Sequence, residues 1–291
     1  MKCVPARPRA TGDDGIHTPR APACRRGGCC VKTERHRAII ERLDTGGDVS
    51  VAELVEMFDV SEMTIRRDLF ELERTGVLRR VHGGATPVGG RAYEPPFRVR
   101  EGQQPDRKQA IATAAAGLVT HGDAIGLDVG STVLMMADSL ASVRQLTIVT
   151  ASLRVAWAVA SSHALEQSAR LIVTGGVVRA EELSMTGQAA ADRFRSMRLD
   201  KAFVGVGGLS PAVGATEFNL EDAEVKKVMI RSARKVIVLA DTSKLGNESF
   251  AHVAAVDDID VLVTDAAADH PAVVEFERAG VEVVTARPSR S

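Results

Sequence analysis

Residues 61–69, Ser61-Glu-Met-Thr-Ile-Arg-Arg-Asp-Leu69, decide the fold of the first part of this 291-residue chain. Ser61 is a favourable N-cap, so a helix is expected to begin directly after it. Ile65, Leu69 and Leu72 repeat at helical spacing and predict a face that packs inward. The outward side then carries Glu62, Met63, Arg66, Arg67 and Phe70.

A second helix is expected just upstream, before a short turn at Asp59-Val60. Ser50 is its N-cap. Its apolar residues fall at i, i+3, i+4 and i+7, namely Val51, Leu54, Val55 and Phe58. A further helical pattern starts at Thr33 and is closed by Gly46-Gly47. Two short helices joined by a tight turn, the second capped by serine, describe a helix-turn-helix.

Residues 77–85 (VLRRVHGGA) alternate apolar and basic side chains and end in two glycines, which predicts a β-hairpin wing. The second helix of a helix-turn-helix enters the major groove, and the planar fork of arginine can bind guanine or phosphate at two points. Adjacent arginines on a helix are more often plain solvated surface, but cap, turn, apolar stripe and basic hairpin together favour a DNA contact. The residues expected at DNA are Ser61, Thr64, Arg66, Arg67, Arg79, Arg80 and His82.

The overall charge is balanced, with 37 Lys and Arg against 38 Asp and Glu and a formal net charge of −1. This excludes a polybasic protein held to nucleic acid by bulk charge. Residues 32–86, the predicted winged helix-turn-helix, contain nine basic and eleven acidic side chains. DNA binding therefore depends on basic groups being gathered on one face. No apolar run approaches the ~18–20 residues of a membrane span, so no membrane partner is expected.

Residues 1–31 differ in composition from the rest of the chain. They hold all four cysteines and four prolines, show no apolar periodicity, and lack the apolar stretch of a secretory signal. We expect a disordered tail here and at 287–291. Two alternatives stay open: translation that starts at Val31, so that the tail is never made, or a zinc site from Cys24, Cys29, Cys30 and His17. Without the tail no cysteine remains, which fits a reducing cytoplasm.

The remainder reads as a linker and one larger domain. Residues 87–106 contain four prolines and Gly89-Gly90 without any period, which predicts an extended, moderately stiff linker. Within 107–286, strands are expected at 124–127, 146–149, 171–173, 202–206, 236–240, 261–263 and 281–284. Helices are expected at 109–119, 132–140, 153–160, 187–197, 220–233 and 271–279. This alternation predicts an α/β domain with a mostly parallel sheet buried on both faces.

Polar residues and glycines directly follow six of these strands. In open α/β sheets, ligands bind outside the carboxyl ends of the strands. Glycine lets backbone amides approach closely and Ser and Thr add hydroxyls at helix starts, which suits an anionic, hydroxylated ligand. Each segment alone could be an ordinary turn or cap, but their coincidence at one sheet edge favours a polyol-phosphate site. The segments are 128–132, 150–152, 174–176, 207–208, 241–244 and 264–265.

At this point the sequence resembles a known family. Residues 61–69, Leu72-Glu-Arg-Thr-Gly76 and Arg80-Val-His-Gly-Gly-Ala85 are similar to the signature of the DeoR family of bacterial transcriptional regulators. The resemblance covers nearly all of 33–286. It implies a winged helix-turn-helix and a sugar-phosphate-sensing domain whose fold resembles ribose-5-phosphate isomerases and CoA transferases. It also implies a homo-oligomer, a dimer or tetramer, that is usually a repressor released from operator DNA by a catabolic intermediate.

The resemblance further implies roles for single residues. The loop Gly130-Ser131-Thr132 would hold the phosphate. The pocket would be lined by Asp128, Thr150, Ser152, Gly175, Gly176, Gly207 and Gly208. Sugar hydroxyls or phosphate would be contacted by Glu217, Lys227, Asp241 and Lys244. The family's usual Thr-Asn-Ser is Thr150-Ala151-Ser152 here, which removes an amide.

The alternative is a sugar-phosphate isomerase with a fused DNA-binding head. Isomerisation needs a carboxylate that moves a proton between adjacent carbons. Related isomerases carry acidic residues at the strand end that matches Gly205–Leu209, where this chain has glycines and no Asp or Glu. We therefore expect a regulator and not an enzyme. Because nucleotide motifs and clustered His/Cys sets are missing from this domain, neither cofactor nor metal is expected.

Overall fold

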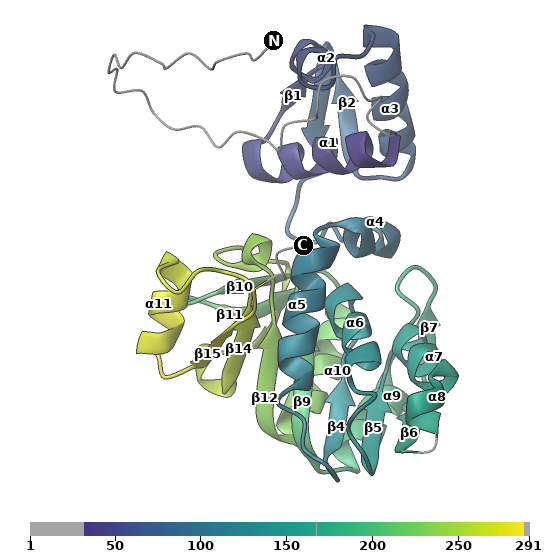
Figure 1. The fold of residues 1–291 in the computed structure, drawn as a ribbon, viewed down its shortest axis with the longest axis vertical. Coiled ribbons are helices and arrows are strands. Elements are labelled where there is room, and N and C mark those ends of the chain that lie inside the picture. Colours follow the sequence, from purple (N-terminus) through teal and green to yellow (C-terminus); the bar gives the residue numbers. More distant parts are fainter. Residues whose placement is uncertain (1–31, 167, 288–291) are drawn as a thin grey trace, which may run out of the picture.

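The computed structural model describes residues 32–166 and 168–287, which form a small head (residues 32–87) and a larger body (residues 105–287) joined by a linker (Figure 1). The predictions made for residues 1–31 and 288–291, including the disordered tails and the zinc alternative, lie outside the described residues. Among the described helices, none combines the length and the apolar character that a membrane crossing requires.

The head has the predicted winged helix-turn-helix architecture. Its helices are α1 (Lys32–Gly46), α2 (Val51–Phe58) and α3 (Glu62–Arg74). Its strands are β1 (Val49–Ser50), β2 (Leu78–Val81) and β3 (Gly84–Pro87). The strands form an antiparallel sheet in the order β1-β3-β2, and its β2–β3 hairpin is the wing.

Serine caps determine where α2 and α3 begin. The Ser50 hydroxyl accepts a hydrogen bond from the Glu53 amide at 3.1 Å, and the Glu53 carboxylate accepts one from the Ser50 amide at 2.8 Å. The Ser61 hydroxyl accepts from the Thr64 amide at 3.2 Å. Such caps satisfy amides that have no partner inside the helix. The fully or nearly fully buried core of the head includes Ile39, Leu54, Ile65, Leu69 and Leu78.

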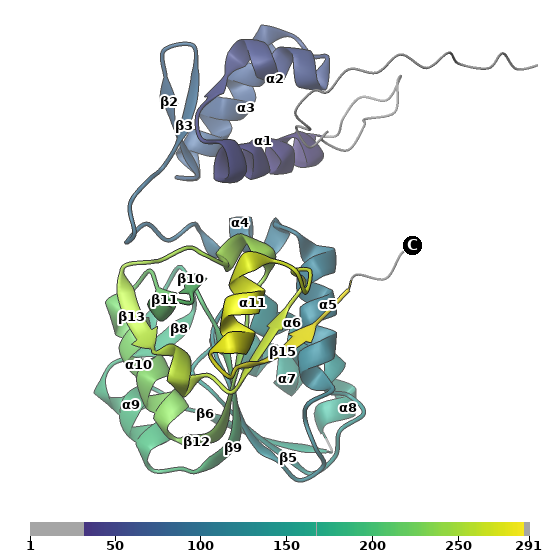
Figure 2. The ribbon, with the colours of Figure 1, turned by 90° about the vertical axis from the view of Figure 1, so that its left-hand side faces the viewer.

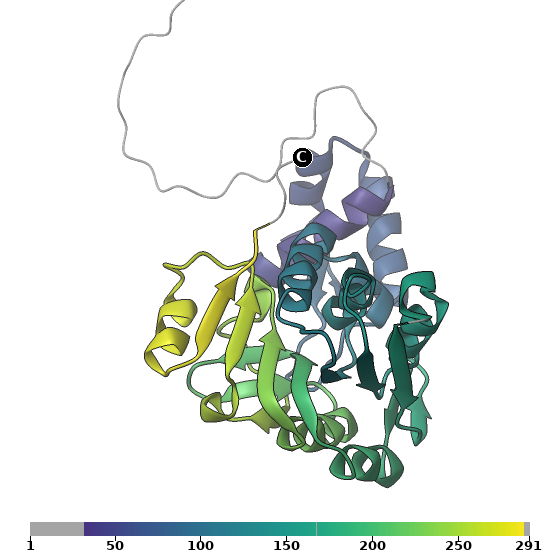
Figure 3. The same ribbon diagram turned by 60° about the horizontal axis from the view of Figure 1, so that its bottom comes forward.

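The body is built on a seven-stranded parallel sheet in the order β15-β14-β12-β9-β4-β5-β6 (Figure 3). Its strands are β4 (Ala124–Leu127), β5 (Leu146–Thr150), β6 (Ala169–Val173), β9 (Leu199–Gly205), β12 (Ala233–Leu239), β14 (Val261–Thr264) and β15 (Glu282–Thr285). Each corresponds to one of the predicted strands, so the predicted α/β fold is confirmed.

Helices cover both faces of this sheet (Figure 2). One face packs on α5 (Pro105–Ala116), α6 (Ser131–Ser139) and α7 (Leu153–Ser161). The other packs on α9 (Gln188–Arg195), α10 (Leu220–Arg231) and α11 (Pro271–Arg278). Neighbouring strand residues therefore enter different cores, as Phe203 and Val204 do.

The linker differs from its prediction. Residues 87–106 contain a helix, α4 (Phe97–Gly102), and α5 already begins at Pro105, so the prediction that this stretch is extended throughout is wrong. The Phe97 ring is 3% exposed, and the Arg154 guanidinium lies 3.9 Å from its centre. Packing on the body, rather than a repeat in the sequence, stabilises α4. Pro105 suits the first turn of α5 because its missing amide hydrogen has no partner there.

Several short elements were not predicted, because three or four residues show no period. They are α8 (His163–Glu166), β7 (Val177–Arg179), β8 (Ser184–Thr186), β10 (Gly208–Ser210), β11 (Gly214–Glu217), β13 (Ala251–Ala254), and the 3-10 turns η1 (Thr242–Lys244) and η2 (Val256–Asp258). β7 pairs with β8, and β10, β11 and β13 form a second small sheet.

Candidate functional site

The outward side of α3 is an exposed basic ridge. The side chain of Arg67 is 80% exposed and lies 3.5 Å from Glu71, one turn along the helix. Arg66 is 55% exposed and pairs with Glu62 at 2.6 Å, also on α3. Because both ion pairs lie within one helix, neither guanidinium is packed against the core, and both are accessible to a duplex.

The wing packs beside the second half of α3. Arg80 of β2 pairs with Glu73 at 2.7 Å, and its guanidinium lies 5.1 Å from the centre of the Phe70 ring. Arg80 is thus tied to α3 although its side chain is still 41% exposed, and Arg79 and His82 are exposed too. The other predicted DNA contacts lie in the first turns of α3, where the Ser61 and Thr64 hydroxyls are 2.9 Å apart.

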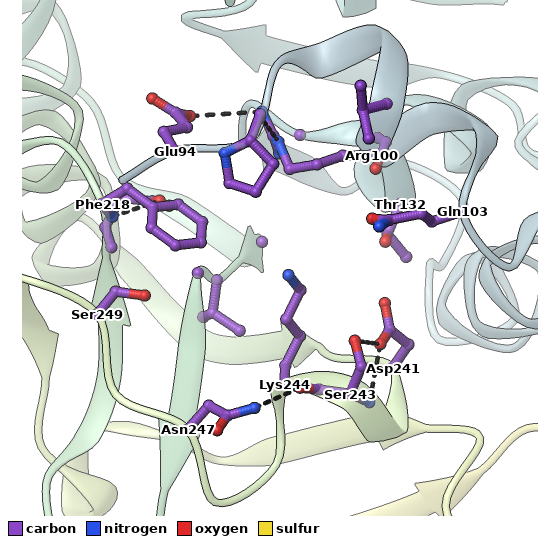
Figure 4. Close-up of a pocket in the computed structure, with 18 of the residues that line it drawn as sticks. Glu94, Arg100, Gln103, Thr132, Phe218, Asp241, Ser243, Lys244, Asn247 and Ser249 are labelled. Carbon is purple, nitrogen blue, oxygen red and sulfur yellow. Dashed lines mark hydrogen bonds and ion pairs between the residues drawn. The ribbon is translucent and has the colours of Figure 1, made fainter. Parts of the chain in front are cut away.

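A pocket of about 570 Å³ lies at the carboxyl ends of β4, β9 and β12, with the linker along one side (Figure 4). That volume suits a small-molecule ligand. Its lining combines residues of the body with Glu94, Arg100 and Gln103 of the linker, and it also includes three residues of the head, Ile40, Glu41 and Val77. The residues predicted at the effector that line it are Gly130, Ser131, Thr132, Gly207, Glu217, Asp241 and Lys244.

Two of the lining glycines have a steric reason to be glycine. Gly130 has φ 119°, in the region that disfavours side chains, and it brings the first turn of α6 to the pocket. A Cβ on Gly207 would lie 2.7 Å from the Ser249 hydroxyl and 2.9 Å from the Phe218 ring. Any larger residue at this position would displace two walls of the pocket.

A buried ion cluster forms the floor of the pocket. Lys226 of α10 lies 2.9 Å from Asp128, donates to the Gly205 carbonyl at 2.8 Å, and pairs with Glu217. Burial raises the pKa of Asp128 to about 6, although Lys226 opposes this. Burial would also raise the pKa of Glu217, but Lys226 outweighs it and holds that pKa below its usual value. Burial would lower the pKa of Lys226, but the two carboxylates keep it above its usual value.

Further ion pairs attach the linker to the body. Arg100 contacts Glu182 and lies 3.4 Å from Glu94. Arg179 of β7 lies 2.8 Å from Glu94 and pairs with Asp222. Two guanidinium groups face three carboxylates here, so these pairs add no positive charge to the pocket.

Two ammonium groups are not paired in this way within the described residues. Lys108 of α5 is 4% exposed and donates to the backbone carbonyl of Arg100. Burial lowers its pKa to about 8, although the nearby Asp241 carboxylate opposes this. The Lys244 side chain extends into the cavity (Figure 4), with its nitrogen 5.7 Å from the centre of the Phe218 ring. Within residues 32–166 and 168–287 neither lysine forms an ion pair, so the pocket is equipped for an anion beside the start of α6.

Some predicted residues lie elsewhere. Thr150 accepts a hydrogen bond from the Ser152 amide at 3.0 Å, and Ser152 caps α7. Gly175 and Gly176 lead into β7; a Cβ on Gly176 would lie 2.4 Å from a backbone oxygen of β8. The β7–β8 hairpin therefore occupies the ends of β5 and β6, where the sequence placed part of the ligand. Gly208 is outside the lining too, because its Cα packs against the backbone of the loop after η1.

Lys227 is not brought to the pocket either. It pairs with Glu224 at 2.7 Å on the outer side of α10, and its neighbour Lys226 points inward instead. The helical spacing of the sequence could have indicated that Lys226 points inward, because Lys226 shares the buried stripe of α10 with Asp222 and Met229. Lys108 was missed although it precedes Ile111 by three residues on the buried stripe of α5. In the described part of the chain no three His, Cys, Asp or Glu side chains are grouped as a metal site would require.

Comparison with known proteins matches both parts of the chain. Residues 35–88 match the DeoR-like helix-turn-helix domain, and residues 103–266 match the DeoR C terminal sensor domain. The Bacillus subtilis protein YulB, described as an uncharacterized HTH-type transcriptional regulator, is 35% identical over 250 residues, which are 86% of this chain and 95% of that protein. The glycerol-3-phosphate regulon repressor of Escherichia coli is 32% identical over 235 residues, 81% of this chain and 91% of that protein.

Solved structures give more distant similarity. Ribose 5-phosphate isomerase A from Methanocaldococcus jannaschii has a TM-score of 0.37 and 19% identity, covering 49% of this chain and 55% of that one. A probable sor operon regulator from Shigella flexneri has a TM-score of 0.34 and 16% identity, covering 49% of this chain and 77% of that one.

Proposed function

Since the chain belongs to the DeoR family of bacterial transcriptional regulators, we propose that it represses a carbohydrate-catabolism operon and leaves the operator when a sugar or polyol phosphate binds the pocket. The glycerol-3-phosphate regulon repressor among its relatives supports this class of regulon. Paired operator half-sites require paired heads, so the working form is a dimer or tetramer acting on DNA in the cytoplasm.

The observation that carries this proposal is the pair of lysines Lys108 and Lys244, which form no direct ion pair within the described residues and lie beside Ser131 and Thr132. A phosphate monoester carries about two negative charges at pH 7 and three acceptor oxygens. Ammonium groups, hydroxyls and the amides of a helix start are donors for such a group. Asp241 and Glu217, which also line the pocket, can accept hydrogen bonds from ligand hydroxyls.

The isomerase alternative is less well supported. Carboxylates are present after all, because Glu217 lines the pocket and Asp128 lies behind it. Both are held by Lys226. Glu217 lines the pocket, but its lowered pKa makes it a poor base near neutral pH, whereas Asp128, whose pKa is raised to about 6, does not line the pocket. We therefore propose a binding protein rather than an enzyme, and expect no turnover of ribose 5-phosphate above background.

The proposal is tested by a thermal-shift screen of sugar and polyol phosphates, each paired with its unphosphorylated parent. A ligand that binds only the native state raises the melting temperature. The compound that stabilises the protein should also release it from operator DNA, whereas its parent should do neither. A pocket that responds equally to the parent compounds would contradict the phosphate assignment.

We also propose how the pocket reaches the head. Residues 244–250, the pocket loop, contact the linker twice: Glu248 lies 3.1 Å from Arg91, and the Phe250 amide donates to the Arg91 carbonyl at 2.9 Å. Two residues later, the Tyr93 hydroxyl donates to the carbonyl of Gly76, directly after α3. Because Lys244 belongs to the same loop, a ligand that moves it displaces the linker and with it the recognition helix.

Glu248→Gln should weaken this coupling and leave DNA binding without effector unchanged; because Glu248 also lines the pocket, the comparison is made at saturating effector. Coupling between two sites typically amounts to about 1–3 kcal/mol, so wild-type DNA affinity should fall at least about fivefold when effector binds. In the variant that fall should shrink below about twofold, as measured by DNA titrations with and without effector. Arg98→Ala, at an exposed residue of α4, is the matched control. If effector releases the Glu248→Gln variant from DNA as fully as it releases the wild-type protein, the coupling does not pass through the contact between Glu248 and Arg91.

Effector affinity should fall as pH rises above 8. The pKa of Lys108 is lowered to about 8 in the free protein, and a bound phosphate raises it again by favouring the charged form. The positive charge of Lys108 that stabilises the bound phosphate is therefore present below pH 8 and is lost above it. Effector affinity should then fall by up to about tenfold for each pH unit. Calorimetry from pH 7 to 9 measures this, and Lys108→Met should bind weakly with a flat profile. A wild-type profile that is also flat would contradict the role of Lys108.

A further inference from the structure

A second concave site lies in the head, between α1 and α3. This depression, the α1–α3 notch, has a volume of about 350 Å³. Its lining is Lys32, Arg35, Met63, Thr64, Arg67 and Asp68. Three of these side chains are cationic and one is a carboxylate. The lining side chains therefore sum to a positive charge within a head that is acidic overall, and Glu71 beside the mouth reduces this excess.

The floor of the notch is rigid. Asp68 of α3 is buried and accepts from the Arg35 guanidinium of α1 at 2.5 Å, and the His36 ring nitrogen lies 3.1 Å from its other oxygen. These contacts fix the angle between α1 and α3. A negatively charged ligand in the notch would therefore contact side chains that are already positioned before it binds.

The mouth of the notch is formed by exposed cations. Glu71 lies on α3 between Lys32 and Arg67; it pairs with the first and lies 3.5 Å from the second. The side chains of Lys32 and Arg67 are 52% and 80% exposed. Exposed ion pairs contribute little stability, so a stronger anion can take both cations from Glu71.

The position of the notch identifies its ligand. Thr64 and Arg67 lie on the outward side of α3, the side proposed to enter the major groove, and both also line the notch. An anion in the notch would lie directly beside α3. When α3 is bound in the major groove, the phosphate backbone of the duplex lies at this position. Phosphate contacts of this kind fix the register of a recognition helix without reading sequence.

We infer that the α1–α3 notch holds one backbone phosphate of the operator duplex, with Lys32 and Arg67 at its mouth and Arg35 at its floor. This inference rests on the proposed DNA-binding function. It makes α1 a third contact element beside α3 and the wing. Asp68 acts as a positioning residue, because it touches Arg35 and not the DNA.

Lys32→Gln tests this inference without disturbing the Arg35–Asp68 pair. Duplexes enriched from a random-sequence pool by the full-length wild-type protein serve as the probe, titrated between about 50 and 200 mM salt. Loss of one phosphate contact should make the slope of log Kobs against log salt shallower by about 0.9, and affinity at 0.1 M salt about eightfold weaker. Arg37→Gln, also exposed on α1 but outside the notch, should leave both unchanged.

Ethylation interference supplies an independent readout. One phosphate whose ethylation blocks the wild-type protein should no longer matter for Lys32→Gln. Three results would each refute the phosphate site in the notch. They are an unchanged salt slope in Lys32→Gln, an equal change of slope in Arg37→Gln, and an interference pattern identical to that of the wild-type protein. In those cases the wild-type protein still binds its duplex, so the proposed function survives. If the wild-type protein enriches no duplex, the proposed function itself is wrong and the notch with it.

Discussion

Arg67→Ala should lower operator affinity by roughly 10- to 100-fold and leave effector binding unchanged, because a hydrogen bond between charged groups contributes about 1.5–3 kcal/mol. The Arg67 side chain is 80% exposed on the outward side of α3, so its truncation costs the fold little. The pocket is lined mainly by the body and the linker, with Ile40, Glu41 and Val77 of the head at its edge, and Arg67 is not part of its lining. The two functions should therefore separate cleanly in this variant.

A gel-shift titration with operator DNA measures the loss, and a thermal shift with effector confirms that the sensor still works. Arg74→Ala is the matched control, since it removes the same exposed charge from the last turn of the same helix. Equal losses in both variants would indicate bulk charge rather than a recognition helix. Unchanged affinity in Arg67→Ala would refute the assignment of α3.

The head could be predicted almost completely because each of its signals is local. Ser50 and Ser61 are caps whose partners lie three residues away. The stripe of Ile65, Leu69 and Leu72 is read within one helix. The sequence did not show which charged side chains form ion pairs. Arg80 pairs with Glu73, seven residues away, and only the folded wing brings the two together.

The parallel sheet could be predicted for a similar reason, but the pocket only in part. Carboxyl ends of parallel strands meet at one edge, which correctly gathered Gly130, Gly207 and Asp241. The same rule failed at β5 and β6, because it does not show that the β7–β8 hairpin covers those ends. Whether another segment covers the end of a strand depends on tertiary structure, and no local sequence pattern indicates it.

Charged residues on buried stripes were the most informative signal that went unused. Lys108 and Lys226 each stand where an apolar residue would be expected, and burying a charge is costly unless it is compensated. Lys226 is compensated by two carboxylates, which makes it a structural element of the pocket floor. Lys108 donates directly to a backbone carbonyl and receives only partial compensation from Asp241, so an anionic ligand would supply the direct ion pair that it does not form in the described structure.

Thr132→Ala combined with Lys244→Ala should leave operator affinity within about twofold of wild type and raise the effector concentration for half-release by roughly 100-fold. Hydrogen bonds to charged groups contribute about 1.5–3 kcal/mol each, so losing two of them is sufficient for this shift. Thr132 lies in the first turn of α6, and Lys244 extends into the cavity from η1. Neither residue belongs to the head, so DNA binding should persist.

DNA titrations at increasing effector concentration measure this shift. Thr113→Ala with Lys235→Ala is the control, because it removes the same groups from surface sites outside the pocket. If the pocket variant left DNA at the wild-type ligand concentration, the effector would have to bind elsewhere. If it no longer bound DNA, the pocket would support the DNA-bound state without ligand. The expected outcome, a repressor that binds DNA but no longer responds, requires that Lys244 senses the ligand and that the linker merely transmits it.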